Sequence, residues 1–225
     1  MDVQRESMRD QVKRVLLNRI LDGAYQPGDR LVELQIAREL NTSHGPVREA
    51  LRELEGLHLV ESQTYRGTYV RGISAEEMYG AYLVRGVLEE LAAQLAADQF
   101  KANTAALKHE VKAMRAAAKT RNLDRFAHHN ATFHRLIVQA AGNPILLQVW
   151  ESLACELRTR INLVRIVAHL EAVAELHQPI VEALAQGDGQ AAGQLLRNHF
   201  DEIQPPKPHS KSENSSTNSS IGAIS

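Results

Sequence analysis

The sequence predicts a mainly α protein in which a small N-terminal unit with a β-hairpin precedes a C-terminal antiparallel all-helical bundle of about six helices. Three observations lead to this fold class. The chain has 225 residues, more than one typical domain of about 100–150 residues. Its composition is 44% hydrophobic but only 4% aromatic, which favours helices over a β-sandwich. Apolar residues also recur at helical spacing along most of the chain.

Three short helices and a hairpin are expected in the first seventy or so residues. An apolar stripe of helical spacing ends at Gly23, before the turn at 26–29. After a short extended piece at 31–32, a second helix is expected at 34–40, and Thr42 or Ser43 can cap a third helix with Pro46 in its first turn. Segments 59–63 and 68–71 are rich in β-forming residues and flank a turn. Two short helices followed by a hairpin predict a winged helix-turn-helix.

The remainder of the chain is predicted to be helical. Ser74 is a good N-cap, with Glu77 in the capping-box position, for a helix that runs to about Phe100. Turn-forming residues separate the further helices expected at about 104–119, 123–141, 144–166, 170–186 and 189–203. The predicted domains are therefore 1–73 and 74–204. The tail at 205–225 is almost without apolar residues until its end, so it is predicted to be disordered.

Charge and cysteine content restrict the class of protein. Cys155 is the one cysteine, so no intramolecular disulfide is possible, and no N-terminal segment resembles a signal peptide or a membrane span. We therefore expect a cytoplasmic protein without a membrane partner. The net charge is −1, and residues 1–74 are also close to neutral. Any binding of DNA must therefore depend on a few well-placed cations.

The third predicted helix has residues suited to binding double-stranded DNA. Recognition in the major groove uses side chains at the N-terminal end of a helix, with cations nearby for the phosphates. An alternative is a solvated charged face, in which neighbouring glutamates balance the arginines. The candidate contacts lie at the helix tip, on its outer side, on the preceding helix and at the hairpin turn: Arg38, Ser43, His44, Gly45, Arg48, Arg52, Arg66 and Gly67.

Three segments of this region, 23–31 (Gly-Ala-Tyr-Gln-Pro-Gly-Asp-Arg-Leu), 36–40 (Ile-Ala-Arg-Glu-Leu) and 46–51 (Pro-Val-Arg-Glu-Ala-Leu), resemble the winged-helix domain of the GntR family. The resemblance implies that Arg38 and Arg48 bind phosphates and bases, that Ser43 and Gly45 contact DNA at the helix tip, and that Gly67 lets the wing enter the minor groove. His44 and Gly45 depart from the family pattern, which usually has Arg followed by Thr or a similar residue. A neutral histidine contributes less salt-dependent affinity than an arginine.

Arg85 is predicted to lie on the inner face of the long helix, together with Met78, Tyr82, Leu88, Ala92 and Leu95. A charge that points into a core needs a partner. One interpretation is a snorkelling or salt-bridged arginine, for example one paired with Glu89 a turn away. The other is a clamp for the carboxylate of an acidic effector.

Three histidines are expected on the inner faces of different helices. His134 lies one turn after Asn130, and His177 and His199 lie on two later helices. Buried histidines are often packed core residues, but three of them on converging helices can form a metal site. Spacing alone leaves both interpretations open.

Segments 82–89, 130–134, 141–144 and 175–177 resemble the all-helical FCD-type effector domain of the FadR subgroup of GntR regulators, over about 76–203. The resemblance implies a divalent metal such as zinc or nickel bound by His134, His177 and His199, with Asn130 in place of the usual aspartate. A neutral amide is a weaker ligand than a carboxylate, so metal affinity is expected to be reduced. In metal-bearing relatives a small carboxylate completes the coordination. Arg85 is the first candidate to bind it here, and Arg158 and Arg160 are further ones.

These features together predict a homodimeric, ligand-responsive DNA-binding transcription regulator. The leading hypothesis is a repressor that a small organic acid releases from a pseudo-palindromic operator. One alternative is a metal-dependent hydrolase that uses the three histidines, although no His-Glu-x-x-His sequence supplies a general base. Another is a DNA binder without an effector, in which the histidines are only packed.

Overall fold

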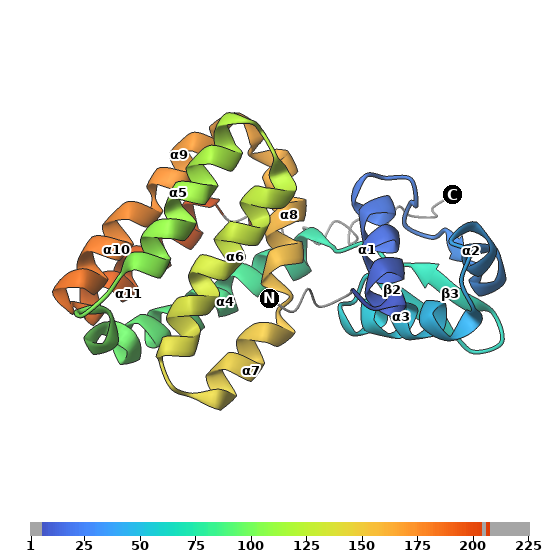
Figure 1. Ribbon diagram of the computed structural model, residues 1–225, viewed down its shortest axis with the longest axis horizontal. Helices are drawn as coiled ribbons and strands as arrows, with labels where there is room; N and C mark the ends of the chain where they lie inside the picture. The colour runs from blue at the N-terminus through green and yellow to red at the C-terminus, as the bar shows by residue number, and fades with distance from the viewer. Residues whose placement is uncertain (1–5, 204–205, 208–225) are drawn as a thin grey trace, which may run out of the picture.

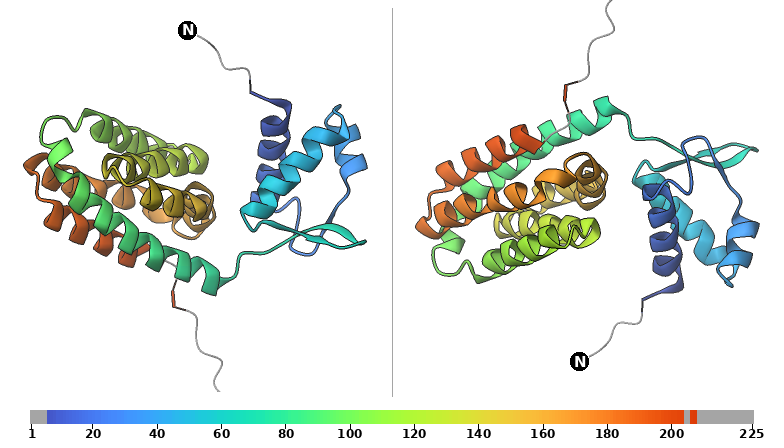
Figure 2. Two further views of the ribbon diagram at one scale, coloured as in Figure 1. Left: turned by 90° about the horizontal axis from the view of Figure 1, so that it is seen from below. Right: turned by 90° about the horizontal axis from the view of Figure 1, so that it is seen from above.

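The computed structural model describes residues 6–203 and 206–207, and these form two bodies joined by a short extended segment (Figure 1). The smaller body, the head (residues 8–70), contains the sheet. The larger body, the bundle (residues 75–203), is helical, and the two views of Figure 2 show the same division. Each body has its own hydrophobic core. The mainly α fold class with a winged helix-turn-helix is confirmed.

The head contains three helices and a three-stranded sheet. Its elements are α1 (Met8–Leu21), β1 (Arg30–Leu31), α2 (Glu33–Glu39), α3 (His44–Gly56), β2 (Val60–Gln63) and β3 (Gly67–Val70). The strand order is β1-β3-β2, with both pairs antiparallel, and Val60 lies opposite Val70. Leu16 of α1 and Val47 and Leu54 of α3 are completely buried, so the inner face of α3 packs on α1 and leaves its opposite face to solvent.

The bundle begins at the expected capping box, in which Ser74 and Glu77 satisfy each other's backbone N–H groups. The long helix α4 packs against α11, α6 and α10, and α5 packs against α6 and α9. The helices of the bundle are α4 (Ala75–Phe100), α5 (Ala105–Lys119), α6 (Leu123–Ala140), α7 (Pro144–Ser152), α8 (Cys155–Arg165), α9 (Leu170–Glu175), α10 (His177–Gln186) and α11 (Gly189–Ile203), with a 3₁₀ turn at Val167–His169.

Two of the helices predicted from the sequence are each broken in two. The segment expected at 144–166 breaks before α8, where Ala154 takes a left-handed conformation with φ 49°. There Nε of Arg158 donates to the carbonyl of Leu153 at 2.8 Å, which satisfies a group that the helix leaves free. The segment expected at 170–186 breaks at Leu176. Pro179 explains this second break, because it has no N–H for the carbonyl of Glu175 and its ring would clash there.

One expected inner position of α4 is wrong. Leu95 is 49% exposed, whereas Met78, Tyr82, Arg85 and Ala92 are buried as expected. Leu95 belongs to an outward stripe at spacings of three and four residues, which we call the α4 stripe: Val84, Val87, Leu91 and Leu95.

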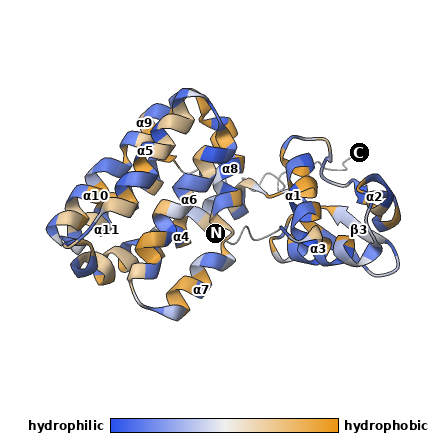
Figure 3. Cartoon of the chain, in the orientation of Figure 1, coloured by the Kyte–Doolittle hydropathy of each residue, from blue (hydrophilic) through white to orange (hydrophobic). Residues whose placement is uncertain are grey.

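Apolar surface also occurs on α7, which shows the hydrophobic colour in Figure 3, and its Ile145 and Val149 are exposed. Among the described residues, no helix is both long enough and apolar enough to cross a bilayer. The predicted disordered tail lies outside the described residues apart from 206–207.

Candidate functional site

The eight candidate DNA contacts are all exposed on the head. Ser43 occupies the N-cap position of α3, and its side chain makes no capping hydrogen bond. His44 and Gly45 form the first turn of α3, and there is open space where a side chain at Gly45 would lie. The tip of α3 is therefore open to an approaching ligand.

Three exposed arginines lie on or beside the helix-turn-helix. Arg48 makes an ion pair with Glu33 of α2 at 3.3 Å, and both side chains remain partly exposed. Within residues 6–203, no carboxylate pairs with Arg38 or Arg52. An exposed ion pair contributes little to stability, so exchanging Glu33 for a phosphate would cost the head little.

The hairpin turn positions Gly67 at the start of β3 with φ +100°, a conformation that favours glycine. A Cβ at this position would also lie 3.1 Å from the side chain of Arg30. Tyr65, at the tip of the same turn, is completely exposed. Tyr65 is not among the predicted contacts, although its place between two β-forming segments marks it as a turn residue.

The structure brings the three predicted histidines together inside the bundle. His134 of α6, His177 of α10 and His199 of α11 are buried, and each offers a ring nitrogen within 4.8 Å of the others. Among the described residues they form the one group of three or more such side chains close enough to bind a metal ion. Asn130 lies beside them, with Nδ2 3.0 Å from Nε2 of His177.

Neighbouring groups orient two of these imidazoles. Nδ1 of His177 lies 3.0 Å from the carbonyl oxygen of Val173, so it carries the proton and donates it, which leaves Nε2 with a lone pair. Nδ1 of His134 lies 2.5 Å from Oε2 of Glu89. In metal sites, such outer partners fix the tautomer and orient the opposite nitrogen toward the ion.

Glu89, expected from the sequence only as a partner for Arg85, lies at the centre of a larger network. Its Oε1 accepts from Nε of Arg85 and from Nε1 of Trp150, both at 2.7 Å, while Oε2 faces His134. Arg85 also donates from Nη1 to Thr159 at 3.2 Å. The salt-bridged interpretation of Arg85 therefore describes its geometry. Nη2 of Arg85 is buried and has no hydrogen-bond partner, so it still has N–H groups to donate to an acceptor.

The protonation states follow from burial and from this ion pair. Burial lowers the pKa of His177 to about 3 and lowers the pKa values of His134 and His199 as well, so all three imidazoles are neutral near pH 7. Burial alone would raise the pKa of Glu89. The neighbouring His134 and Arg85 outweigh it and bring that pKa to about 2, so Glu89 is ionised.

The buried polar atoms fit a divalent metal ion. Neutral imidazoles are ligands for zinc and nickel, and an amide oxygen can be a fourth ligand. Both ring nitrogens of His199 and Oδ1 of Asn130 lack a hydrogen-bond partner, and so does Nε2 of His134. Buried polar groups are seldom left unpaired, which supports a ligand at this point. We call the three histidines and Asn130 the histidine centre.

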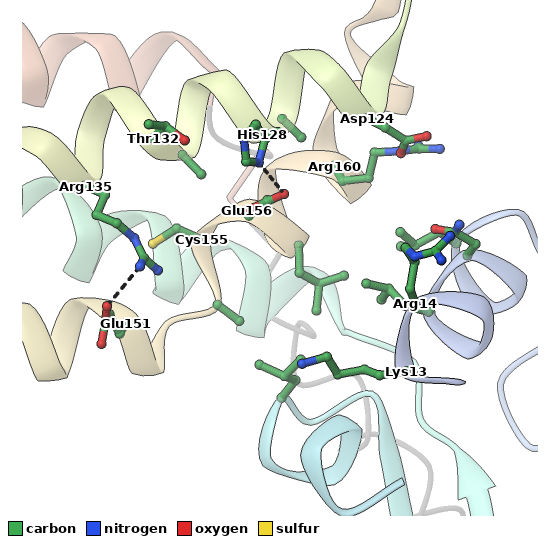
Figure 4. A pocket seen from close by; sticks show the side chains of 18 of the residues that line it. Lys13, Arg14, Asp124, His128, Thr132, Arg135, Glu151, Cys155, Glu156 and Arg160 are labelled. Carbon is green, nitrogen blue, oxygen red and sulfur yellow. Dashed lines mark hydrogen bonds and ion pairs between the residues drawn. The ribbon is translucent and has the colours of Figure 1, made fainter. Parts of the chain in front are cut away.

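A groove of about 820 Å³ lies between the head and the bundle, lined by α1 on one side and by α6, α7 and α8 on the other (Figure 4). Several basic and acidic side chains that line it lie close to each other in pairs. Arg135 lies 3.3 Å from Glu151, and His128 lies 3.4 Å from Glu156. The groove therefore shows no strong excess of one charge.

Comparison with known proteins is consistent with both parts of the structure. Residues 8–70 match the family described as bacterial regulatory proteins, gntR family, and residues 81–202 match the FCD domain. A relative named "Probable D-xylose utilization operon transcriptional repressor", from Paenarthrobacter nicotinovorans, is 35% identical over 206 residues, which are 92% of this chain and 91% of the relative. The Escherichia coli K12 protein "HTH-type transcriptional repressor RspR" is 27% identical over 93% of each chain.

A solved structure titled "E. coli McbR/YncC" has the same fold, with a TM-score of 0.68 over 87% of this chain and 94% of its own, at 23% identity. The chain belongs to the GntR family of bacterial regulatory proteins and has an FCD domain. It is a DNA-binding transcription regulator and not an enzyme, and nothing supports the hydrolase alternative.

Proposed function

We propose that the protein is a repressor that a small organic acid releases from its operator. The observation that carries this proposal is the group of unpartnered polar atoms around the histidine centre and Arg85. In this proposal a carboxylate would share its two oxygens between a metal ion bound by the histidines and Nη2 of Arg85, which has no hydrogen-bond partner. The printed name of the relative from Paenarthrobacter, an operon repressor for the use of a sugar, supports the repressing direction.

The histidine centre would bind a divalent ion such as zinc or nickel through His134, His177 and His199, with Asn130 as a weak fourth ligand. The metal would supply a Lewis-acidic position for the carboxylate of the effector. In the metal-free protein the Asn130 amide donates to Nε2 of His177, so metal binding must replace this hydrogen bond. The neutral fourth ligand and the loss of this hydrogen bond both support a modest metal affinity.

The exposed groups of the head would make the DNA contacts. Ser43, His44 and Gly45 would face base edges in the major groove, and Arg38, Arg48 and Arg52 would bind the flanking phosphates. Arg66 and Gly67 would lie at the minor groove, with the hairpin as the wing. In this proposal residues 1–73 bind DNA and residues 74–204 bind the effector.

A homodimer is the assembly that suits a pseudo-palindromic operator. The α4 stripe supports it, because four exposed aliphatic side chains on one helix form a surface that can pack on its own copy around a two-fold axis. Two heads would then bind two half-sites. An effector that prefers one separation of the heads would shift the operator affinity.

The experiment that tests this proposal measures operator binding by fluorescence anisotropy. A duplex selected from a random-sequence library by the full-length protein serves as the operator. Zinc chloride alone, and then zinc chloride with acetate, citrate or D-gluconate, is added to the complex. Release of the duplex by at least one acid, in wild type but not in the Arg85→Ala variant, supports the proposal. Release by none of them, with tight binding of the duplex retained, favours the effector-independent DNA binder.

A further inference from the structure

Helix α8 contacts both bodies of the molecule. It begins after the break at Ala154 and lies on the side of the bundle nearest to the head (Figure 1). One face, with Cys155, Thr159 and Leu163, is buried in the bundle, and α8 packs there on α6. Its other face, with Leu157 and Ile161 one turn apart, packs against the hydrophobic core of the head.

The bundle face of α8 contacts the proposed effector site. Thr159 is buried, and its Oγ1 accepts from Nη1 of Arg85 at 3.2 Å. Arg85 also pairs with Glu89, which faces His134 of the histidine centre. A carboxylate that binds Nη2 attracts the same rigid guanidinium whose Nη1 contacts Thr159, so a shift of the guanidinium toward it would alter that contact.

The head face of α8 fastens the two bodies together. Leu157 is buried in the core of the head beside residues of α1 and α3. Arg160, the neighbour of Thr159, makes ion pairs with Asp124 of α6 and, at 3.6 Å, with Asp22 at the end of α1. The side chain of Arg160 is mostly buried, while Asp22 and Asp124 are largely exposed.

The remaining boundary between the two bodies is loosely packed. The groove of about 820 Å³ separates α1 from α6 and α7, and a second cavity of about 290 Å³ lies between the head and Ile161 and Val164 of α8. Close-packed interfaces resist sliding, whereas open space beside a packed helix lets it shift. A displacement of α8 would therefore move the head against the bundle.

We propose that α8 transmits occupancy of the effector site to the DNA-binding head, with Thr159 as its contact to Arg85 and Arg160 and Leu157 as its contacts to the head. This inference rests on the proposed function and specifies how it is regulated. Two sites are energetically coupled when the binding of a ligand at either site changes the contacts of one shared structural element. Helix α8 has such contacts with both Arg85 and the head.

Hydrogen–deuterium exchange of the full-length protein tests the coupling without an operator or an identified effector. Thr159→Val removes the hydroxyl that Arg85 contacts. We expect it to speed exchange in peptides from α1 and from the α3–β2 junction by about threefold or more. Thr159→Ser retains the hydroxyl and should exchange as the wild type does. Thr120→Val, which removes an exposed hydroxyl at the end of α5 far from Arg85 in the chain, is the control for the substitution itself.

Arg160→Ala should weaken the connection to the head and leave Leu157 as the remaining contact, so that adding Thr159→Val to it changes exchange in α1 less than Thr159→Val does in the wild type. Exchange changes that Thr159→Val confines to the bundle would overturn the proposal. The proposal would also be overturned if Thr159→Val speeds exchange in α1 by the same factor with and without Arg160→Ala. Anisotropy with the selected duplex is measured in parallel. Failure of every form to bind DNA contradicts the proposed function, while the exchange result still decides the role of α8.

Discussion

Nδ1 of His134 lies 2.5 Å from Oε2 of Glu89, in a part of the bundle that excludes water. This contact joins the histidine centre to Arg85, because Oε1 of the same carboxylate accepts from the guanidinium. A metal ligand and a candidate anion-binding residue thus share one buried carboxylate. The charge of Glu89 balances Arg85 and orients the imidazole.

Replacing Glu89 with glutamine should therefore affect both stability and metal binding. Removing one partner of a buried ion pair leaves Arg85 uncompensated, and we expect a loss of about 3 kcal/mol in the free energy of unfolding. Zinc affinity should fall by about 10–100-fold, since His134 loses its outer partner. Urea unfolding and calorimetric zinc titration measure the two effects. Glu202→Gln on the exposed side of α11 is the control, and equal zinc affinity in both variants would contradict the role of Glu89.

Replacing Asn130 with aspartate should strengthen metal binding. A carboxylate is a charged ligand, and it no longer donates a hydrogen bond to Nε2 of His177. We expect the zinc dissociation constant to fall by about tenfold or more, measured by competition with a chelator. Asn198→Asp adds the same charge next to His199 in the chain but on an exposed side chain. A similar gain in that control would show that the effect is only long-range electrostatics.

Metal-free protein should lose stability as the pH falls below about 6.5. The unfolded state takes up protons on its histidines near this pH, whereas burial keeps the folded-state pKa of His177 at about 3 and that of His199 well below 6.5. For each such histidine the free energy of unfolding falls by about 1.4 kcal/mol for every pH unit below about 6.5, until the folded-state pKa is reached. Urea unfolding at pH 7.5, 6.5 and 5.5 measures the slope. It should be smaller in His199→Leu and unchanged in His109→Leu, whose side chain is exposed.

Arg38→Ala and Arg52→Ala should each weaken operator binding. Neither arginine has a carboxylate partner within the described part of the head, so each can bind a phosphate without breaking an ion pair. We expect about a tenfold loss of affinity for each variant. The slope of the logarithm of the binding constant against the logarithm of the salt concentration should also decrease by about one in magnitude, because one fewer counterion is released. Anisotropy at several salt concentrations measures both. Arg115→Ala, in the ion pair with Glu175 on the bundle, should leave the slope unchanged.

Val87→Asp should disrupt the proposed dimer. Val87 is 52% exposed in the middle of the α4 stripe, and a two-fold axis there would bring two carboxylates together in an apolar surface. Sedimentation velocity should show a monomer at concentrations where the wild type is a dimer. Val167→Asp replaces another exposed valine outside α4 and should leave the mass unchanged. A Val87→Asp protein that still sediments as a dimer would place the interface elsewhere.

The parts of the fold that local chemistry determines were predictable. The capping box at Ser74 and Glu77, the turn before α2 and the hairpin all depend on residues that lie close together in the chain. Pro179 also marks the break between α9 and α10. The break was nevertheless not predicted, because the apolar residues on either side of Pro179 keep a helical periodicity. The break at Ala154 has no glycine or proline nearby, and it depends on the packing of α8 between two bodies.

The metal ligands of the candidate site were predictable from the sequence, but the residues that hydrogen-bond to them and to Arg85 were not. His134, His177 and His199 could be assigned to inner helix faces because periodicity identifies such faces. The Glu89 network could not, because Trp150 lies 61 residues away in the chain and Thr159 lies 74 residues from Arg85. The α4 stripe was also missed, since a helix with apolar residues on most of its faces does not reveal which one stays uncovered.

Trp150 has a further use because it is the one tryptophan of the chain. Its indole N–H donates to Glu89, and its ring lines the groove between head and bundle. Indole fluorescence depends on hydrogen bonding and on nearby charge, so emission from this single fluorophore reports on the effector site and on the boundary between the two bodies together. The protein thus contains an intrinsic optical signal, and metal or acid binding can be followed in the unlabelled protein.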